Sequence, residues 1–299
     1  MKKVKKYHGV VVPMVTPLLP DFTLDETAVV QLLKKMQQAD VQAFILGTTG
    51  EAASLPWSVK KHYVELAGKQ PRAGHLYVGI SSNCLEESIA MAELAAANGA
   101  DVVVATLPSY YALSPAQILQ YFSDLAAQSP LPLIIYNIPA TTHVSLPLDL
   151  IDQLSLHANI VGLKDSERSE ERLTQSLHLW KDREDFSHFV GWAAKSAEAL
   201  LLGSDGIIPS TGNLEANFYA DLYQSALDGA TENAHAHQRY SDALGAIYQK
   251  DKTLGESLWA LKVLLSGEGI GHAVVMPPLQ TLSQEEAEKL KSEYQKIRK

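Results

Sequence analysis

The sequence predicts a (β/α)₈ barrel with a C-terminal helical extension. Three observations support this fold class: short apolar runs alternate with segments of helical period, the runs are nearly continuous in Val, Ile and Leu, and there are eight of them. Strands that are buried on both faces have this composition. Eight β/α units within about 220 residues fit a closed barrel. A doubly wound open sheet remains the alternative, because periodicity alone does not show closure.

The eight apolar runs follow one another along the first 210 residues. Runs of this short length, separated by helical segments, are typical of buried strands. The predicted strands are VVVPMV (10–15), AFILG (43–47), LYVGI (76–80), DVVVAT (101–106), LPLIIYN (131–137), IVGLK (160–164), FSHFVG (186–191) and DGIIPS (205–210).

Between the strands, apolar residues recur at intervals of three and four, which is the period of a helix with one buried face. Such segments include 25–40, 58–69, 85–99 and 114–128, and after about residue 225 only helical patterns remain, at 228–251, 256–267 and 283–299. We therefore expect a catalytic barrel over residues 1–225. The helical extension over residues 226–299 should pack on the barrel or on a neighbouring subunit.

Composition and charge argue against several classes of protein. A formal net charge of −9 disfavours binding to the phosphate backbone of a nucleic acid. The single cysteine, Cys84, allows neither an intrachain disulfide nor a cysteine metal cluster, and it suits a cytoplasmic location. No stretch reaches the ~18 continuous apolar residues of a membrane span. The basic start and the apolar run after it imitate a signal peptide, but Pro13 and Pro17 interrupt that run.

Two further patterns do not indicate a site. GEGIG at 267–271 follows a helical segment and lacks the spacing of a dinucleotide fingerprint. His235 and His237 are two residues apart on a predicted helix and therefore point to different sides, which disfavours a metal site.

Polar residues stand where three of the predicted strands end. Tyr136 ends the fifth strand, Lys164 ends the sixth, and the GTTGE loop (47–51) follows the second. In a barrel, the carboxyl ends of the strands face one common mouth. A lysine held there is partly desolvated, which lowers its pKa and frees the amine to attack carbonyl groups. On spacing alone, Lys164 could also be a lysine that extends its amine to solvent at a strand edge.

The GTTGE loop suits the binding of a small anion. Two glycines allow the backbone to approach a ligand closely, and the N–H groups and threonine hydroxyls can bind a carboxylate. A plain turn between a strand and a helix is the alternative interpretation. The loop also matches the GXXG pattern of RNA-binding proteins, but the acidic charge of the chain disfavours that match.

Four motifs together resemble the dihydrodipicolinate synthase/N-acetylneuraminate lyase family of class I pyruvate-dependent aldolases. They are GTTGE (47–51), PSYY (108–111), YNIP (136–139) and GLKD (162–165), in the order of that family and with compatible spacing. The resemblance covers nearly the whole chain. It implies that Lys164 forms a Schiff base with pyruvate, that Thr48 and Thr49 hold the carboxylate, and that Tyr136 moves protons.

The resemblance implies further residues and partners. A second tyrosine from a neighbouring subunit relays protons in that family, and Tyr110 matches it better than Tyr111. Gly47, Gly191, Ile208 and Thr141 fall at substrate-binding positions. We therefore expect a cytoplasmic homotetramer, a dimer of dimers, that needs no metal or separate cofactor. Its partners should be pyruvate and a small aldehyde or keto-deoxy acid.

Departures from the family pattern bear on the substrate. The synthases resemble YNxPxRTG after strand five, whereas this chain has Thr141 in place of the carboxylate-binding arginine. Sialate lyases resemble GYDE after strand seven, whereas this chain reads GWAAKS, with Trp192, Ala193 and Ala194. Cleavage of a 2-keto-3-deoxy (4-hydroxy-2-oxo) acid is therefore the leading expectation. Lys195 or Arg168 could still supply a cation.

Three alternatives to that reaction stay open. The first is dihydrodipicolinate synthase activity, in which pyruvate condenses with aspartate semialdehyde. The second is dehydration of a keto-deoxy acid through the same imine. A non-catalytic keto-acid sensor is the third, and the presence of lysine, tyrosine and hydroxyl loop together disfavours it.

Overall fold

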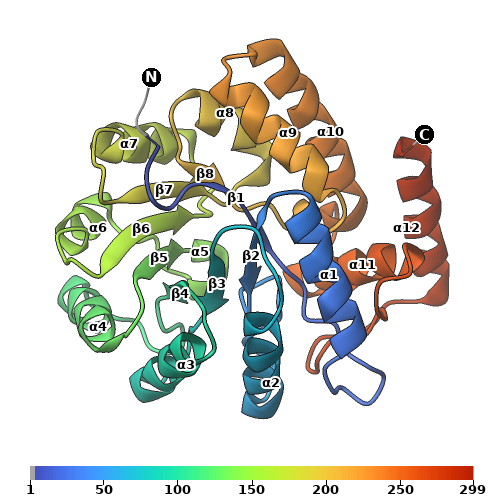
Figure 1. Ribbon diagram of the computed structural model, residues 1–299, viewed down its shortest axis with the longest axis horizontal. Coiled ribbons are helices and arrows are strands. Elements are labelled where there is room, and N and C mark those ends of the chain that lie inside the picture. Colours follow the sequence, from blue (N-terminus) through green and yellow to red (C-terminus); the bar gives the residue numbers. More distant parts are fainter. Residues whose placement is uncertain (1–3, 299) are drawn as a thin grey trace.

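Eight parallel strands close into a barrel in the computed structural model, which describes residues 4–298. The strands lie side by side in chain order and β1 pairs with β8, so the sheet has no free edge (Figure 1). The predicted (β/α)₈ barrel is thus confirmed, and the open sheet is excluded. The strands are β1 (Gly9–Pro13), β2 (Gln42–Ile45), β3 (Leu76–Gly79), β4 (Val102–Thr106), β5 (Leu133–Asn137), β6 (Ile160–Asp165), β7 (Ser187–Val190) and β8 (Gly206–Ile207).

Helices surround the barrel, as Figure 1 shows. Three begin at side-chain caps: the carboxylate of Asp25 accepts from the N–H of Ala28, Ser114 and Gln117 form a reciprocal capping box, and the hydroxyl of Ser169 accepts from the N–H of Arg172. The helices are α1 (Glu26–Gln38), α2 (Trp57–Gly68), α3 (Leu85–Ala97), α4 (Pro115–Gln128), α5 (Pro139–Thr142), α6 (Leu148–Leu154), α7 (Glu170–Trp180), α8 (Ser196–Leu201) and α9 (Ala216–Leu227). Short 3₁₀ turns, η1 (Ala193–Lys195) and η2 (Ser210–Asn213), follow the last two strands.

The last strand is shorter than the sequence predicts. We expected a strand over 205–210, but β8 contains only Gly206 and Ile207. Pro209 has no N–H to donate to a neighbouring strand, and the chain turns into η2 directly after it. The chain that leaves β8 at the mouth therefore forms a turn, most of which is buried.

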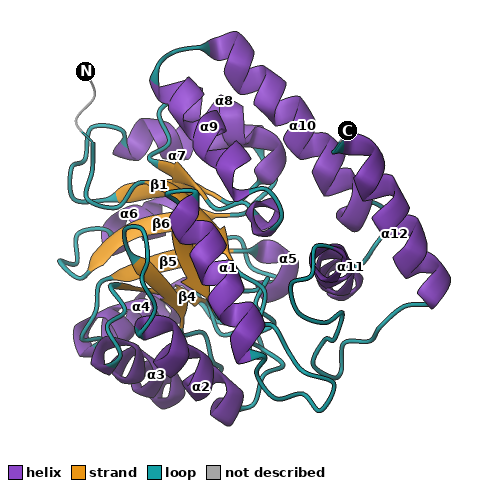
Figure 2. Cartoon of the chain, turned by 45° about the vertical axis from the view of Figure 1, so that its right-hand side comes forward, coloured by secondary structure: helices purple, strands orange, loops and turns teal. Residues whose placement is uncertain are grey.

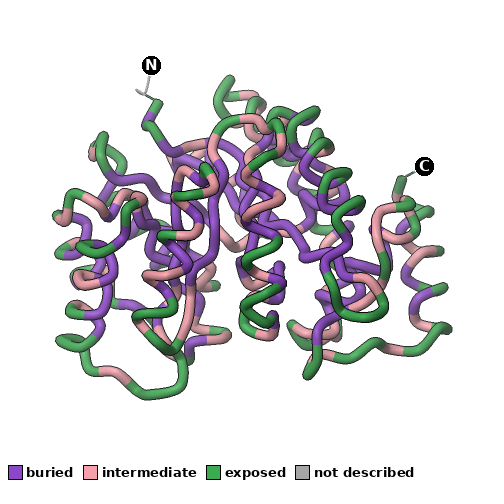
Figure 3. Tube along the Cα trace, turned by 60° about the horizontal axis from the view of Figure 1, so that its bottom comes forward, coloured by how far each residue is buried: buried purple, intermediate pink, exposed green. Residues whose placement is uncertain are grey.

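Apolar side chains alternate between two layers of the core. Inside the barrel, Phe44, Val104, Ile134 and Phe189 belong to one buried cluster. The neighbouring residues on the same strands belong to a separate, larger cluster between the strands and the helices. Because side chains along a strand point alternately to opposite faces, every second residue of a barrel strand faces its interior. Figure 3 shows this buried centre inside an exposed outer surface.

Three helices form the C-terminal extension: α10 (Thr231–Gln249), α11 (Leu254–Gly267) and α12 (Gln284–Ile297). They pack on the same polypeptide, with α10 against α8 and α9, and α10, α11 and α12 each contact the other two (Figure 2). The expected boundary at residue 225 falls within α9, so barrel and extension share this helix. None of the helices described for residues 4–298 is both long and apolar enough to cross a membrane.

Candidate active site

Lys164 and Tyr136 are direct neighbours in the barrel. In the pairing of β5 with β6, Tyr136 lies opposite Lys164, and Asn137 lies opposite Asp165. Tyr136 belongs to the interior cluster, and the amine of Lys164 lies 3.7 Å from the centroid of its ring. The two strand ends singled out from the sequence therefore place their reactive groups in contact inside the barrel.

The residues after this pair hold the two strand ends together on the outer face. The amide of Asn137 donates to the carboxylate of Asp165 at 2.9 Å, and its carbonyl accepts from the N–H of Leu146. The guanidinium of Arg172, on α7, pairs with Asp165 at 2.7 Å. This explains the asparagine of YNIP and the aspartate of GLKD: they fix the register that brings Tyr136 to Lys164.

Lys164 is held in apolar surroundings. Only 3% of the residue is exposed, and its amine also lies 5.0 Å from the centroid of the Phe44 ring. Burial disfavours the ammonium form and lowers the pKa of Lys164, although the nearby Tyr136 opposes this effect. At neutral pH, the neutral and nucleophilic amine is therefore more populated at Lys164 than at a solvent-exposed lysine.

The surroundings of Tyr136 shift the pKa of its phenol downward. Burial alone would raise the pKa of the phenol, but the charge of Lys164 and hydrogen bonds from Thr48 and Ser166 together lower the pKa of Tyr136. The hydroxyl of Thr48 lies 3.5 Å from the Tyr136 oxygen. A phenol of lowered pKa beside an amine can accept and return a proton.

A cavity of about 730 Å³ opens above Lys164, and we call it the lysine cavity. Six of the residues expected from the sequence line it: Lys164, Tyr136, Thr48, Thr49, Gly191 and Ile208. A Cβ atom at Gly191 would lie 2.0 Å from the hydroxyl oxygen of Ser166 and 3.2 Å from the carbonyl oxygen of Asp165, so a larger residue there would displace the Ser166 side chain. The C-terminal extension contributes Tyr248, Gln249, Lys252, Leu254, Ser257, Leu258 and Leu261 to the wall.

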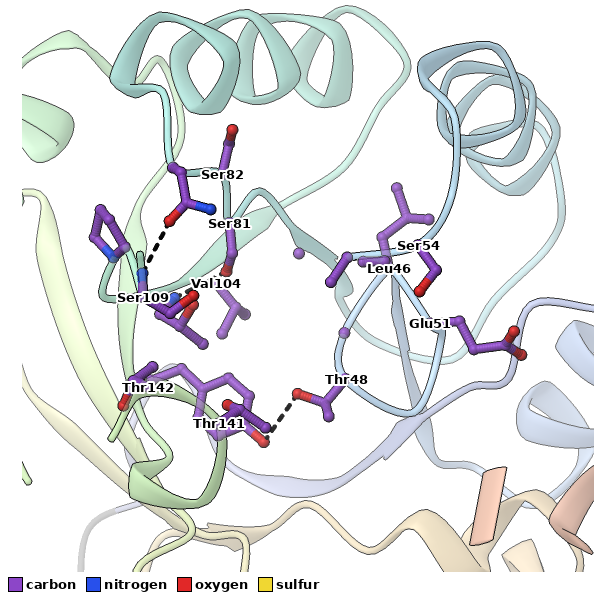
Figure 4. A pocket seen from close by; sticks show the side chains of 18 of the residues that line it. Leu46, Thr48, Glu51, Ser54, Ser81, Ser82, Val104, Ser109, Thr141 and Thr142 are labelled. Atoms are coloured by element: carbon purple, nitrogen blue, oxygen red, sulfur yellow. Dashed lines mark hydrogen bonds between the residues drawn. The ribbon is translucent and has the colours of Figure 1, made fainter. Parts of the chain in front are cut away.

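A second cavity of about 460 Å³, which we call the serine cavity, lies beside it. Its wall includes Ser54, Ser81, Ser82 and Ser109 (Figure 4). Thr48 and Tyr136 line both cavities, whereas Gly47 and Thr141 line the serine cavity. The Thr141 hydroxyl lies 3.4 Å from the carbonyl oxygen of Ile138. Thr141, which stands where the synthases are expected to have an arginine, thus lines the serine cavity, beside the lysine cavity.

The cations near the mouth differ in their partners. The amine of Lys195 binds the carboxylates of Glu170 and Glu198 at 2.5 and 2.6 Å. Arg168 lines the lysine cavity and is exposed, and among the described residues it has no ion-pair partner. Lys252 also lines the cavity and pairs with Glu286 of α12 at 2.9 Å.

Tyr110 and Tyr111 stand on the surface. They are 77% and 74% exposed, and their rings pack edge to face at 4.9 Å. Neither of them lines one of the two cavities. Within residues 4–298, no group of three or more His, Cys, Asp or Glu side chains is arranged to hold a metal ion.

Sequence reasoning missed several residues of the wall. Ser166 directly follows GLKD, so its proximity to Lys164 gave a usable signal. Ser210 and Tyr248 form a hydrogen-bonded pair at 2.7 Å in the lysine cavity, but Tyr248 belongs to α10. A helix remote in sequence gives no local pattern that points to the mouth.

Comparisons with known proteins agree with this geometry. The model of the dihydrodipicolinate synthetase family matches residues 6–297. The 4-hydroxy-tetrahydrodipicolinate synthase of Xanthomonas campestris is 30% identical, over 94% of this chain and 93% of the relative. A probable 2-dehydro-3-deoxy-D-pentonate aldolase of Escherichia coli is 28% identical, over 96% of each chain.

Among solved structures, an Escherichia coli K12 prophage protein of the dihydrodipicolinic acid synthase family, crystallised with pyruvate, superposes with a TM-score of 0.91. It is 26% identical, and the match covers 98% of this chain and 99% of that protein. With the family model matching nearly every residue, and with this barrel and this lysine, the chain belongs to the dihydrodipicolinate synthetase family.

Proposed function

We propose that this protein is a carbon–carbon lyase that uses Lys164 to form a Schiff base with the 2-oxo acid it cleaves or makes. The observation that carries the proposal is the contact between the buried amine of Lys164 and the phenol of Tyr136 in the wall of the lysine cavity. The family relationship and the pyruvate-bound neighbour support it.

The reaction follows from the chemistry of the pair. The neutral amine of Lys164 attacks the keto carbon of a 2-oxo acid, and loss of water leaves a protonated imine. The imine accepts the electron pair of the bond between C3 and C4 when that bond breaks, so the product is an enamine instead of a free carbanion. Tyr136 takes the proton of the C4 hydroxyl as the aldehyde forms. Protonation of the enamine at C3 and hydrolysis of the imine then release pyruvate.

The GTTGE loop supplies the binding of the acid group. Thr48 and Thr49 line the lysine cavity, and Thr48 is also near the Tyr136 hydroxyl. We assign to their hydroxyls and backbone N–H groups the carboxylate next to the keto carbon. That assignment places the reacting carbon between the amine of Lys164 and the phenol of Tyr136.

The substrate class we favour is a 2-keto-3-deoxy acid or a related 4-hydroxy-2-oxo acid. The wall of the lysine cavity contains Trp192, Ala193 and Ala194 after β7, where the sialate lyases resemble GYDE with an acidic pair that binds the sugar hydroxyls. The relative named as a 2-dehydro-3-deoxy-D-pentonate aldolase supports this class. Condensation with aspartate semialdehyde is the second candidate, which the synthase among the relatives supports.

We also propose a homo-oligomer, a dimer of dimers, that acts in the cytoplasm. The exposed pair Tyr110 and Tyr111 supports an aromatic subunit contact, since two large rings on one surface loop offer apolar area to a partner. Tyr110 would then pass protons between Tyr136 of the neighbouring subunit and solvent.

Reductive trapping tests the proposed function. Borohydride added with pyruvate should raise the intact mass by one reduced pyruvyl unit, and Lys164→Ala should abolish the increase. Lys60→Ala is the matched control, because Lys60 lines the serine cavity and should leave the adduct unchanged. Absence of the adduct in the unaltered chain would refute the mechanism. Pyruvate release from a panel of 2-keto-3-deoxy acids, compared with loss of water from the same acids, separates a lyase from a dehydratase.

A further inference from the structure

Glu51, the last residue of the GTTGE loop, is buried against the C-terminal extension. Its side chain is fully covered and forms an ion pair with Lys262 of α11, whose side chain is 2% exposed. The second carboxylate oxygen of Glu51 accepts the backbone N–H of Met276 at 2.7 Å. The amine of Lys262 in turn donates to the carbonyl of Val274 at 2.6 Å. Glu51 therefore connects a loop after β2 to α11 and to the segment between α11 and α12.

The backbone around this loop is held in an unusual shape. Leu46 and Glu51, on its two sides, both have φ of 57°, in the left-handed region that residues other than glycine rarely adopt. Such conformations persist where the surrounding contacts hold them. Besides the contacts of Glu51, the hydroxyl of Thr16 donates to the carbonyl of Gly50 at 2.6 Å.

Glu51 and Thr48 face opposite sides of the same loop. In Figure 4 the side chains of Thr48 and Glu51 leave the loop in opposite directions, although both residues line the serine cavity. Only two residues separate them along the chain. A shift of the backbone at Glu51 therefore moves Thr48 and Thr49, which line the lysine cavity.

The buried pair is better suited to fix geometry than to add stability. Removing two charges from water offsets most of their attraction, so an apolar pair of the same shape is often as stable. A carboxylate, however, offers acceptors to two donors at once, and here those donors belong to Lys262 and to the backbone of Met276. Burial lowers the pKa of Lys262, and the Glu51 carboxylate opposes this effect and favours the ammonium form.

We propose that Glu51 is a positioning residue that, through Lys262, makes the C-terminal extension part of substrate binding. The ion pair sets the position of the 47–51 backbone at the barrel mouth, and thereby the place where Thr48 and Thr49 bind the substrate carboxylate. This inference rests on the proposed function, because it assigns that carboxylate to the loop.

The substitution Glu51→Gln tests it with little change of shape. An amide has one acceptor oxygen, so its NH₂ group must face one of the two donors, and the loop has to move. The pyruvate concentration for half-maximal borohydride trapping should rise on the order of 10- to 100-fold, because a small misplacement of a binding group can have an effect of this size. The trapping rate at saturating pyruvate should fall by less, about threefold, because Lys164 and Tyr136 are on other strands.

Asp205→Asn is the matched control, since Lys5 and Asp205 form another buried pair, with side chains 4% and 5% exposed. It should lower the melting temperature but leave half-maximal trapping within twofold. Glu51→Asp keeps two acceptor oxygens, so its increase should be smaller than that of E51Q, and it serves as the readout if E51Q does not fold.

The outcomes separate the two proposals. An unchanged half-maximal concentration in E51Q, or in E51D where E51Q is unfolded, overturns the positioning role. An equal increase in Asp205→Asn also overturns it, because the effect would then be general destabilisation. An unaltered chain that gives no pyruvate adduct overturns the proposed function, and this inference with it.

Discussion

The two ends of the barrel each bury a lysine, but they surround it with different groups. At the end where the strands begin, the amine of Lys5 donates to Asp205 at 2.8 Å and to the carbonyls of Trp180 and Phe186 at 2.9 and 2.7 Å. At the mouth, Lys164 instead meets the rings of Tyr136 and Phe44 and borders a cavity. A lysine surrounded by acceptors has its amine occupied by structural contacts, whereas one placed among rings beside a cavity can become a nucleophile.

This difference implies that substitutions at the two ends change different quantities. At the mouth they should change rates and substrate binding with little effect on stability. At the opposite end they should change the free energy of unfolding and leave the rates of the folded protein unaltered. The same division is general for barrels of this type, in which the carboxyl ends of the strands carry the active site.

The largest expected effect is at the mouth, from Tyr136→Phe. This substitution removes one hydroxyl, and the ring can keep its place over Lys164. Loss of a general acid–base group commonly lowers turnover by on the order of 10²–10⁴-fold. Steady-state pyruvate release from a 2-keto-3-deoxy acid, together with the melting temperature, would measure both quantities. Turnover close to that of the unaltered chain would mean that another group moves the proton.

At the opposite end, Asp205→Asn should act on stability. The Asp205 carboxylate accepts both the Lys5 amine and the backbone N–H of His188, each at 2.8 Å. Breaking a buried pair by removing one partner costs about 3 kcal/mol or more of unfolding free energy. Urea denaturation should show this loss, while kcat and KM below the melting range stay within twofold. A changed kcat with unchanged stability would contradict the division between the two ends.

The sequence predicted the scaffold well, because the barrel depends on strand periodicity. A strand buried on both faces has a near-continuous apolar run, and the residue that ends it at the mouth stands out by its polarity. Lys164 and Tyr136 stood out as polar residues at strand ends, and the register of β5 with β6 places them in contact. Their catalytic roles were implied by the four family motifs and stay a prediction.

The rest of the site depends on contacts between distant segments, which leave no local pattern. Glu51 and Lys262 belong to different parts of the chain, and neither flanking sequence indicates an ion pair. Thr141 was predicted at the position where the synthases have an arginine. It lies in the wall of the serine cavity, which Thr48 and Tyr136 also line, and its contact with substrate stays a prediction.

A smaller effect should appear in the pH dependence of stability at His188. The ring lies between the hydroxyls of Ser176 and Ser204, at 3.1 and 3.2 Å. Burial lowers the pKa of His188 from 6.5 to about 4, with Asp165 and Asp205 opposing this effect and Lys5 and Arg172 adding to it. Between these two pH values the unfolded chain binds one more proton than the folded chain. The contribution is therefore fully present above pH 6.5 and is lost as pH falls toward 4.

Unfolding free energies at pH 7 and pH 5 would measure this contribution. We expect a decrease of about 2 kcal/mol from this group, since each pH unit within the window contributes at most about 1.4 kcal/mol. His188→Gln should reduce the decrease, because a neutral amide cannot take up the proton. An identical decrease in the variant would assign the pH dependence to other groups. Trapping of pyruvate should be unaffected, as expected for a residue outside the mouth.

The smallest expected effect concerns Thr141 and Arg168, which line the serine cavity and the lysine cavity, respectively. If Thr141 stands where the synthases have an arginine, the carboxylate of aspartate semialdehyde meets a hydroxyl instead of a cation. A charge-assisted hydrogen bond contributes roughly 1.5–3 kcal/mol, so kcat/KM for the condensation should be about tenfold or more below that for cleavage of a 2-keto-3-deoxy acid. Arg168 is the cation on the other side of the mouth, and because it is exposed, Arg168→Gln should change either reaction by no more than a few-fold. An efficient condensation that collapses in Arg168→Gln would show that the acceptor carboxylate binds in the lysine cavity, and the protein would then be a synthase.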